Sequence, residues 1–83
     1  MNRVLKFEAS WCQPCKMLTK TLNDMDADSI ATIVKVDIDQ RGDLAQEFGV
    51  RGVPTMVMVD GDNKEIKRLV GMHTEAKLKE FFA

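Results

Sequence analysis

Residues 11–16 read Trp11-Cys12-Gln13-Pro14-Cys15-Lys16 and contain both cysteines of this 83-residue chain. An alternating apolar run at residues 3–9 comes before them and predicts a β-strand. A helical pattern begins directly behind them and continues to about residue 24. This order places a cysteine at the N-terminus of a helix, where unpaired backbone N–H groups and the helix dipole favour a thiolate. A thiolate with a second thiol two residues further on predicts thiol–disulfide exchange.

Length and composition narrow the class of protein. The length predicts a single domain over residues 1–83. A net charge of −1 gives no electrostatic sign of binding to nucleic acid or to an anionic membrane. The chain shows no signal-peptide pattern and no apolar stretch long enough to span a bilayer. We therefore expect a cytoplasmic protein that binds neither nucleic acid nor membrane. We also expect a monomer that needs no cofactor.

The remaining segments predict an α/β fold. Further strands are expected at residues 32–38, 55–59 and 65–70, and further helices at 43–48 and from Thr74 onward. The first crossover connection should be right-handed and its two strands parallel, whereas the last two strands form an antiparallel hairpin. The prediction is a four-stranded mixed sheet in the order strand–helix–strand–helix–strand–strand–helix, with helices on both faces.

This order of elements, with the CxxC motif at the end of the first strand, resembles the thioredoxin fold. Four places in the chain carry the resemblance: residues 11–16, 35–40 and 48–55, and Gly71. It covers nearly the whole chain from Val4, although the family's N-terminal strand and helix are absent, which leaves the strand at 32–38 as an exposed edge. The resemblance implies a protein-disulfide reductase that receives its electrons from thioredoxin reductase.

The two cysteines are expected to divide the chemistry. Cys12 opens the helix, should be the more exposed and is the expected nucleophile; Cys15 should be more buried and resolve the mixed disulfide. A disulfide closing so short a loop adds only about 2 kcal/mol of stability, which argues against a purely structural pair. Inert thiols are the alternative, but CxxC next to a strand–helix–strand pattern favours redox chemistry. The active-site loop is expected to contain Trp11, Gln13 and Pro14.

A substrate groove is implied by the same resemblance. Pro54 is expected to follow a cis peptide bond, and the backbone of Val53 is expected beside Cys12, where it can pair with a substrate strand. Trp11, Gly71 and Met72 are expected to complete the docking surface. The alternative for Pro54 is an ordinary proline before a strand.

The first strand departs from the family pattern. Lys6 stands where the family has the buried aspartate that accepts the proton of the second cysteine, and Glu8 stands where it has tryptophan; Gln13 replaces the usual glycine. Lys6 and Glu8 share one face of the strand, and isolated buried charges are costly unless paired. We expect a Lys6–Glu8 contact beneath the active site, joined by Lys35, with Glu8 relaying the proton of Cys15. The alternative is that this face is partly wet and both residues are solvated.

Three other functions remain open on the sequence alone. A zinc site needs four protein ligands, or three plus water. The chain offers two cysteines and His73, and nothing in the sequence groups His73 with the cysteines, so a metal would require a site shared by a dimer. A glutathione-dependent, glutaredoxin-like reductase usually carries an acidic pair after the glycine at Gly71, where this chain has Met72-His73-Thr74. A binding or assembly subunit without redox turnover is the third alternative.

Overall fold

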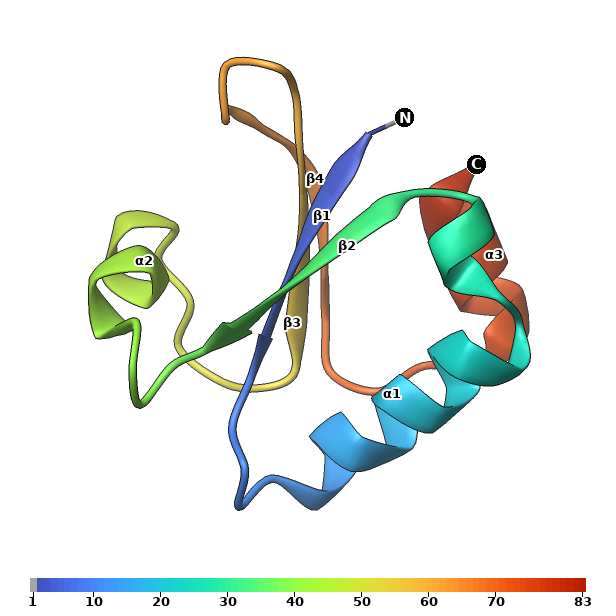
Figure 1. The fold of residues 1–83 in the computed structure, drawn as a ribbon, viewed down its shortest axis with the longest axis horizontal. Coiled ribbons are helices and arrows are strands. Elements are labelled where there is room, and N and C mark those ends of the chain that lie inside the picture. The colour runs from blue at the N-terminus through green and yellow to red at the C-terminus, as the bar shows by residue number, and fades with distance from the viewer. Residues whose placement is uncertain (1) are drawn as a thin grey trace.

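The computed structural model describes residues 2–83 and shows a four-stranded mixed sheet with helices on both sides (Figure 1). The strands lie side by side in the order β2-β1-β3-β4. The β1–β2 pair is parallel and the β1–β3 and β3–β4 pairs are antiparallel, as predicted. Along the chain the elements are β1 (Arg3–Glu8), α1 (Gln13–Asp24), a 3₁₀ turn (Ala27–Ser29), β2 (Thr32–Asp37), α2 (Gly42–Glu47), β3 (Thr55–Val59), β4 (Glu65–Val70) and α3 (Glu75–Phe82).

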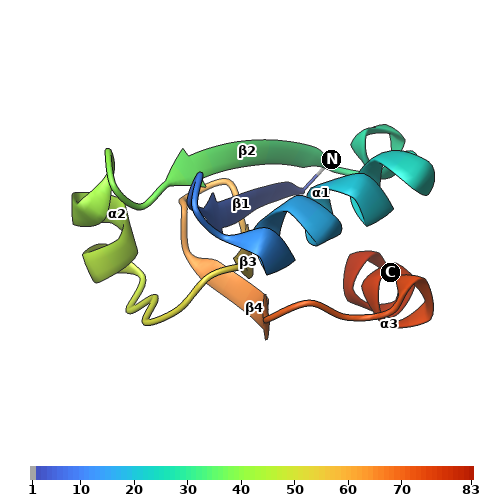
Figure 2. The same ribbon diagram turned by 90° about the horizontal axis from the view of Figure 1, so that it is seen from below.

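Each face of the sheet packs against its own helices. Helices α1 and α3 lie on one face and α2 on the other (Figure 2). Successive side chains of a strand point to opposite faces, so β1 contributes to both layers. Val4 packs with Leu18 of α1 and Leu78 of α3, whereas Phe7 packs towards Phe48, which caps α2. The prediction of helices on both faces is confirmed.

Strand β3 lies between β1 and β4, and all five of its residues are buried. Its continuous apolar run is explained by this position, because both sides of the strand face a helical layer. Strands β2 and β4 form the two edges within residues 2–83. The expectation that the strand at residues 32–38 is an edge is therefore confirmed; β2 ends at Asp37, and the next backbone N–H, of Ile38, still donates to the carbonyl of Glu8.

The turns and helix ends lie at residues whose conformational preferences favour them. Gly49 and Gly71 have positive φ angles of 64° and 88°, a backbone conformation that glycine adopts without a Cβ clash. The Thr74 hydroxyl accepts the backbone N–H of Lys77 and caps α3, as predicted. The polar segment after α1 forms a 3₁₀ turn, and the side chain of Ala27 is buried in the core.

Arg68 ties β4 to the end of α2. Its guanidinium donates hydrogen bonds to both oxygens of Glu65 and to the backbone carbonyl of Phe48. The hydrogen bonds from Arg68 lower the pKa of the Glu65 carboxyl below its ordinary value, against a smaller opposing effect of burial.

The Glu65–Arg68 pair predicts a small acid-dependent contribution to stability. A carboxyl whose pKa is lower in the folded state stabilises the protein above its unfolded-state pKa and loses that effect as pH falls through the folded-state pKa. The pair is partly exposed, so we expect Glu65→Gln to cost at most about 1 kcal/mol at pH 7. Urea unfolding of both proteins should show this difference shrinking on acidification below about pH 4. A difference that grows on acidification would contradict the assignment.

Candidate active site

A disulfide joins Cys12 and Cys15, whose Cα atoms are 5.3 Å apart. Cys12 is the N-cap residue of α1, with extended backbone angles, and Pro14 lies in the first turn, where its missing N–H costs nothing. The backbone N–H of Cys15 points at Cys12 Sγ, with 3.2 Å between nitrogen and sulfur. In the reduced protein the same N–H would meet a thiolate, so this helix start is built to stabilise negative charge on Cys12.

The two cysteines are equally buried, each 4% exposed. The prediction that Cys12 is the more exposed is therefore wrong for the disulfide form. Both residues pack with Ala9, and Ile38 and Val53 lie against this cluster. Position at the start of a helix did not decide exposure, because side chains from distant segments cover both residues alike.

The Val53–Pro54 peptide bond is cis, as predicted. The loop brings the carbonyl oxygen of Val53 to 3.7 Å from Cys12 Sγ. The disulfide sulfur carries no proton, so this is a contact in the oxidised form; a Cys12 thiol could donate a hydrogen bond there. The backbone N–H of Gly71 donates to the Pro54 carbonyl at 2.8 Å and joins the two loops beside the disulfide.

Trp11 is 65% exposed next to the disulfide. Its indole N–H donates to Asp39 Oδ2 at 2.9 Å, which fixes one edge of the ring. Asp39 belongs to a segment that resembles the family, but no local pattern singled it out as a partner of Trp11. The other predicted loop and groove residues vary in exposure: Gln13 and Pro14 are exposed, and Val53, Gly71 and Met72 are half-buried.

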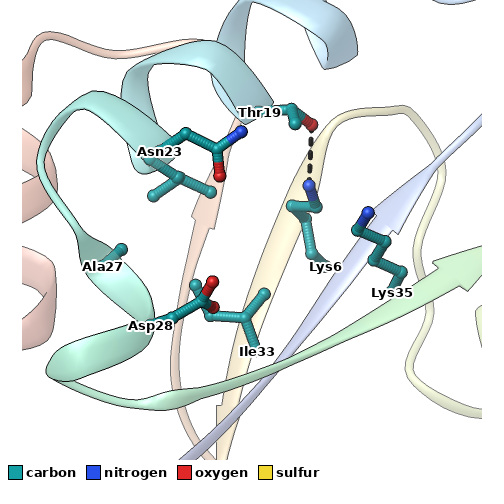
Figure 3. A pocket seen from close by; sticks show the side chains of 8 residues that line it. Lys6, Thr19, Asn23, Ala27, Asp28, Ile33 and Lys35 are labelled. Atoms are coloured by element: carbon teal, nitrogen blue, oxygen red, sulfur yellow. Dashed lines mark hydrogen bonds between the residues drawn. The ribbon is translucent and has the colours of Figure 1, made fainter.

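Lys6 and Glu8 form an ion pair, with 3.0 Å between Nζ and Oε1. Lys6 is buried at 3% exposure and also donates to Thr19 Oγ1 at 2.7 Å (Figure 3). The expected contact is confirmed, and the alternative of a solvated Lys6 is wrong. Glu8 Oε1 is buried and lacks a hydrogen bond of good geometry, so the ion pair is its contact. Sequence reasoning missed Thr19, whose signal was its place one helical turn after Cys15.

Lys35 lies beside Lys6 in the register of β1 and β2, and the two side chains extend in the same direction (Figure 3). Lys35 is exposed, and no ion pair joins it to Glu8 within the described part of the chain. Its expected place in the Lys6–Glu8 contact is therefore not found. With Lys6, Thr19 and Asn23 it lines a hollow of about 110 Å³ under α1.

His73 is not part of a group of metal-ligating side chains in the described residues. Its Nε2 atom is 2.7 Å from the backbone carbonyl of Val70. Across residues 2–83, no three histidine, cysteine or acidic side chains are grouped so that they could hold a metal ion. No helix in the same range has the length and apolarity to cross a membrane.

A dithiol pair at a helix N-terminus, beside a cis-proline loop on this sheet, defines a thiol–disulfide oxidoreductase. The sequence profile described as Thioredoxin matches residues 1–83. The chain belongs to the thioredoxin family. It is 41% identical over 76 residues to "Thioredoxin" of Chlamydia muridarum, which covers 90% of this chain and 74% of that protein.

A solved structure and a relative fused to a reductase agree with this family assignment. A mutant thioredoxin from Halobacterium salinarum superposes with a TM-score of 0.84 at 34% identity, covering 98% of this chain and 71% of that one. The bifunctional thioredoxin reductase/thioredoxin of Mycobacterium leprae is 35% identical over 77 residues, covering 90% of this chain and 17% of that protein. Thiol–disulfide exchange is thus the activity of this chain, and protein disulfides are its substrates.

Proposed function

We propose that Cys12 is the attacking residue of this oxidoreductase and Cys15 the resolving residue. The Cys12 thiolate attacks one sulfur of a substrate disulfide, and the other substrate sulfur leaves as a thiolate. Cys15 then loses its proton and attacks Cys12 Sγ, which breaks the mixed disulfide and releases the second substrate thiolate. Two electrons pass to the substrate, and the Cys12–Cys15 disulfide is formed.

The Cys15 N–H directed at Cys12 Sγ carries this assignment. It supplies a hydrogen bond to the first sulfur, at the end of the helix where the dipole is positive. Cys15 lies within the first turn of α1, three residues after Cys12, so its sulfur is not at the N-cap position that Cys12 occupies. A nucleophile that is ionised at neutral pH attacks faster than a neutral thiol.

The substrate is proposed to dock across the two loops that border the disulfide. Val53 offers its backbone in the loop before β3, and Trp11 offers a large exposed ring next to the disulfide. Gly71 and Met72 follow β4 and continue this surface, which the Gly71–Pro54 hydrogen bond holds together. A backbone-paired substrate strand would bind with little dependence on its side chains.

The proposed electron donor is thioredoxin reductase. The chain itself is proposed to act as a monomer in the cytoplasm. The relative that fuses the two proteins in one chain supports this partnership. Gly71 is followed by Met72 rather than by an acidic pair that would hold the glutathione amine, which favours this donor over glutathione.

Insulin reduction tests the proposed function. With dithiothreitol as reductant, the protein should accelerate precipitation of the reduced insulin chains above the rate with dithiothreitol alone. With NADPH and a bacterial thioredoxin reductase it should turn over repeatedly, whereas a parallel assay with glutathione and glutathione reductase should stay near background. Activity only with glutathione would contradict the proposed donor, and no activity with any reductant would contradict the function.

A further inference from the structure

Glu8 and Cys15 line the same hollow beside the active-site helix. This hollow, of about 250 Å³, is also bordered by Ala9, Ser10, Lys16 and Thr19. One water molecule occupies about 30 Å³ in the liquid, so the hollow has room for several. Glu8 is the acidic residue of this lining, and Cys15, which becomes a thiol when the disulfide is reduced, is its sulfur-bearing residue.

We propose that Glu8 accepts the proton of Cys15 through water in this hollow, and that Lys6 is the residue that positions Glu8 for it. The inference rests on the proposed division of labour between the cysteines. In the mixed disulfide, the Cys15 Sγ–H proton passes through water to the Glu8 carboxylate. Cys15 Sγ then bonds to Cys12 Sγ, the bond from Cys12 to the substrate sulfur breaks, and the departing thiolate takes a proton from solvent.

Lys6 explains why a carboxylate can be held here. It is a buried ammonium group with two polar contacts, Thr19 Oγ1 at 2.7 Å and Glu8 Oε1 at 3.0 Å. A buried cation without an acidic partner is strongly destabilising. Glu8 therefore stays beside Lys6 on β1, and this places the carboxylate at the wall of the hollow that Cys15 shares.

The energetics favour transfer in the complex rather than in the free protein. A thiol with an ordinary pKa of about 8.5 does not give its proton to a carboxylic acid of ordinary pKa about 4.3 in water. A carboxylate removed from water becomes a stronger proton acceptor. A substrate protein bound over the disulfide would shield the hollow, so proton transfer is expected during resolution, when Cys15 has to react.

Other charged groups lie near Glu8 and belong to the setting of the proposed proton transfer. Lys6 on β1 forms the ion pair with Glu8, Lys16 on α1 borders the same hollow, and Lys35 on β2 is the register neighbour of Lys6. Asp37 is the β2 neighbour of Glu8 in register, and its carboxylate accepts the backbone N–H of Asp39. The pH dependence of resolution is thus expected to change when either Lys6 or Glu8 is replaced.

The test separates attack from resolution. A peptide disulfide carrying two different fluorophores, one on each half, reports release of the first half on attack by Cys12 and of the second on resolution by Cys15. Both rates are measured in single turnovers of the reduced protein from pH 5 to pH 9. Glu8→Gln should slow resolution roughly tenfold or more near pH 6.5, a modest share of what a positioned base supplies, and leave attack within about twofold.

Three further variants sharpen the result. Glu8→Asp keeps a carboxylate and should recover part of the resolution rate. Lys6→Met removes the neighbouring cation and should move the acid limb of the resolution profile to higher pH. Glu47→Gln makes the same chemical change at an exposed position of α2, on the other face of the sheet, and should change neither rate.

Two outcomes would overturn the inference. One is resolution by Glu8→Gln at the unmodified rate over the whole pH range; the other is an equal slowing of both steps, which indicates a structural role. Failure of the proposed function is distinguishable, because the unmodified protein would then release neither half of the peptide.

Discussion

Disulfide reduction by the Cys12→Ser variant should fall to the rate of the reductant alone. Serine keeps the size of the side chain, but its hydroxyl is not ionised at neutral pH, so the helix start has no thiolate to stabilise. Insulin reduction with dithiothreitol measures the loss. Measurable catalysis by Cys12→Ser would contradict the assignment of the nucleophile.

The Cys15→Ser variant should fail in a different way. Attack by Cys12 remains, but the mixed disulfide cannot be resolved from within the protein, so the substrate stays attached. Mass spectrometry of the acid-quenched reaction should find the peptide adduct on Cys12. Turnover of Cys15→Ser at the unmodified rate would show that Cys15 does not resolve the intermediate.

The largest effect on stability is expected from Leu18→Ala. Leu18 is 1% exposed and packs between α1 and the sheet, in the cluster that contains Val4 and Met56. Removing a fully buried leucine costs about 2–5 kcal/mol, through lost burial and the cavity left behind. A domain of this size has a total stability of about 5–10 kcal/mol, so much of it should disappear.

Met17→Ala is the matched control in the same turn of α1. Met17 is 59% exposed, and its truncation should change the free energy of unfolding by no more than about 0.5 kcal/mol. Urea unfolding of the oxidised proteins, followed by circular dichroism, gives both values. Equal losses at the two positions would mean that α1 does not pack as described.

The sequence pattern predicted most of the fold because local signals and burial agree. Strand β3 is apolar from Met56 to Val59 and is buried throughout, and α1 begins at the cysteine and proline that favour a helix start. The cis bond before Pro54 was different. Only resemblance predicted it, because an isolated X–Pro bond in a folded protein is cis in about 5% of cases.

Parts of the site could not be predicted, because they depend on residues distant in the chain. Trp11 meets Asp39 across 28 positions, and the equal burial of the cysteines depends on the loop at Val53. Lys6 and Glu8 were predicted only in part. Alternation placed them on one face, but only the packing of α1 determined that Lys6 is buried against Thr19.

Strand β2 has a consequence for behaviour in concentrated solution. It is an edge within residues 2–83, and an open edge with unpaired backbone groups is a site where chains can join into larger sheets. Lys35 lies in the middle of this edge and points to the face that α1 covers. A second chain that extended the sheet would have to place a strand beside this charged group, and lysines on edge strands oppose such pairing. The same lysine that lies beside Lys6 beneath the active-site helix therefore opposes aggregation through β2.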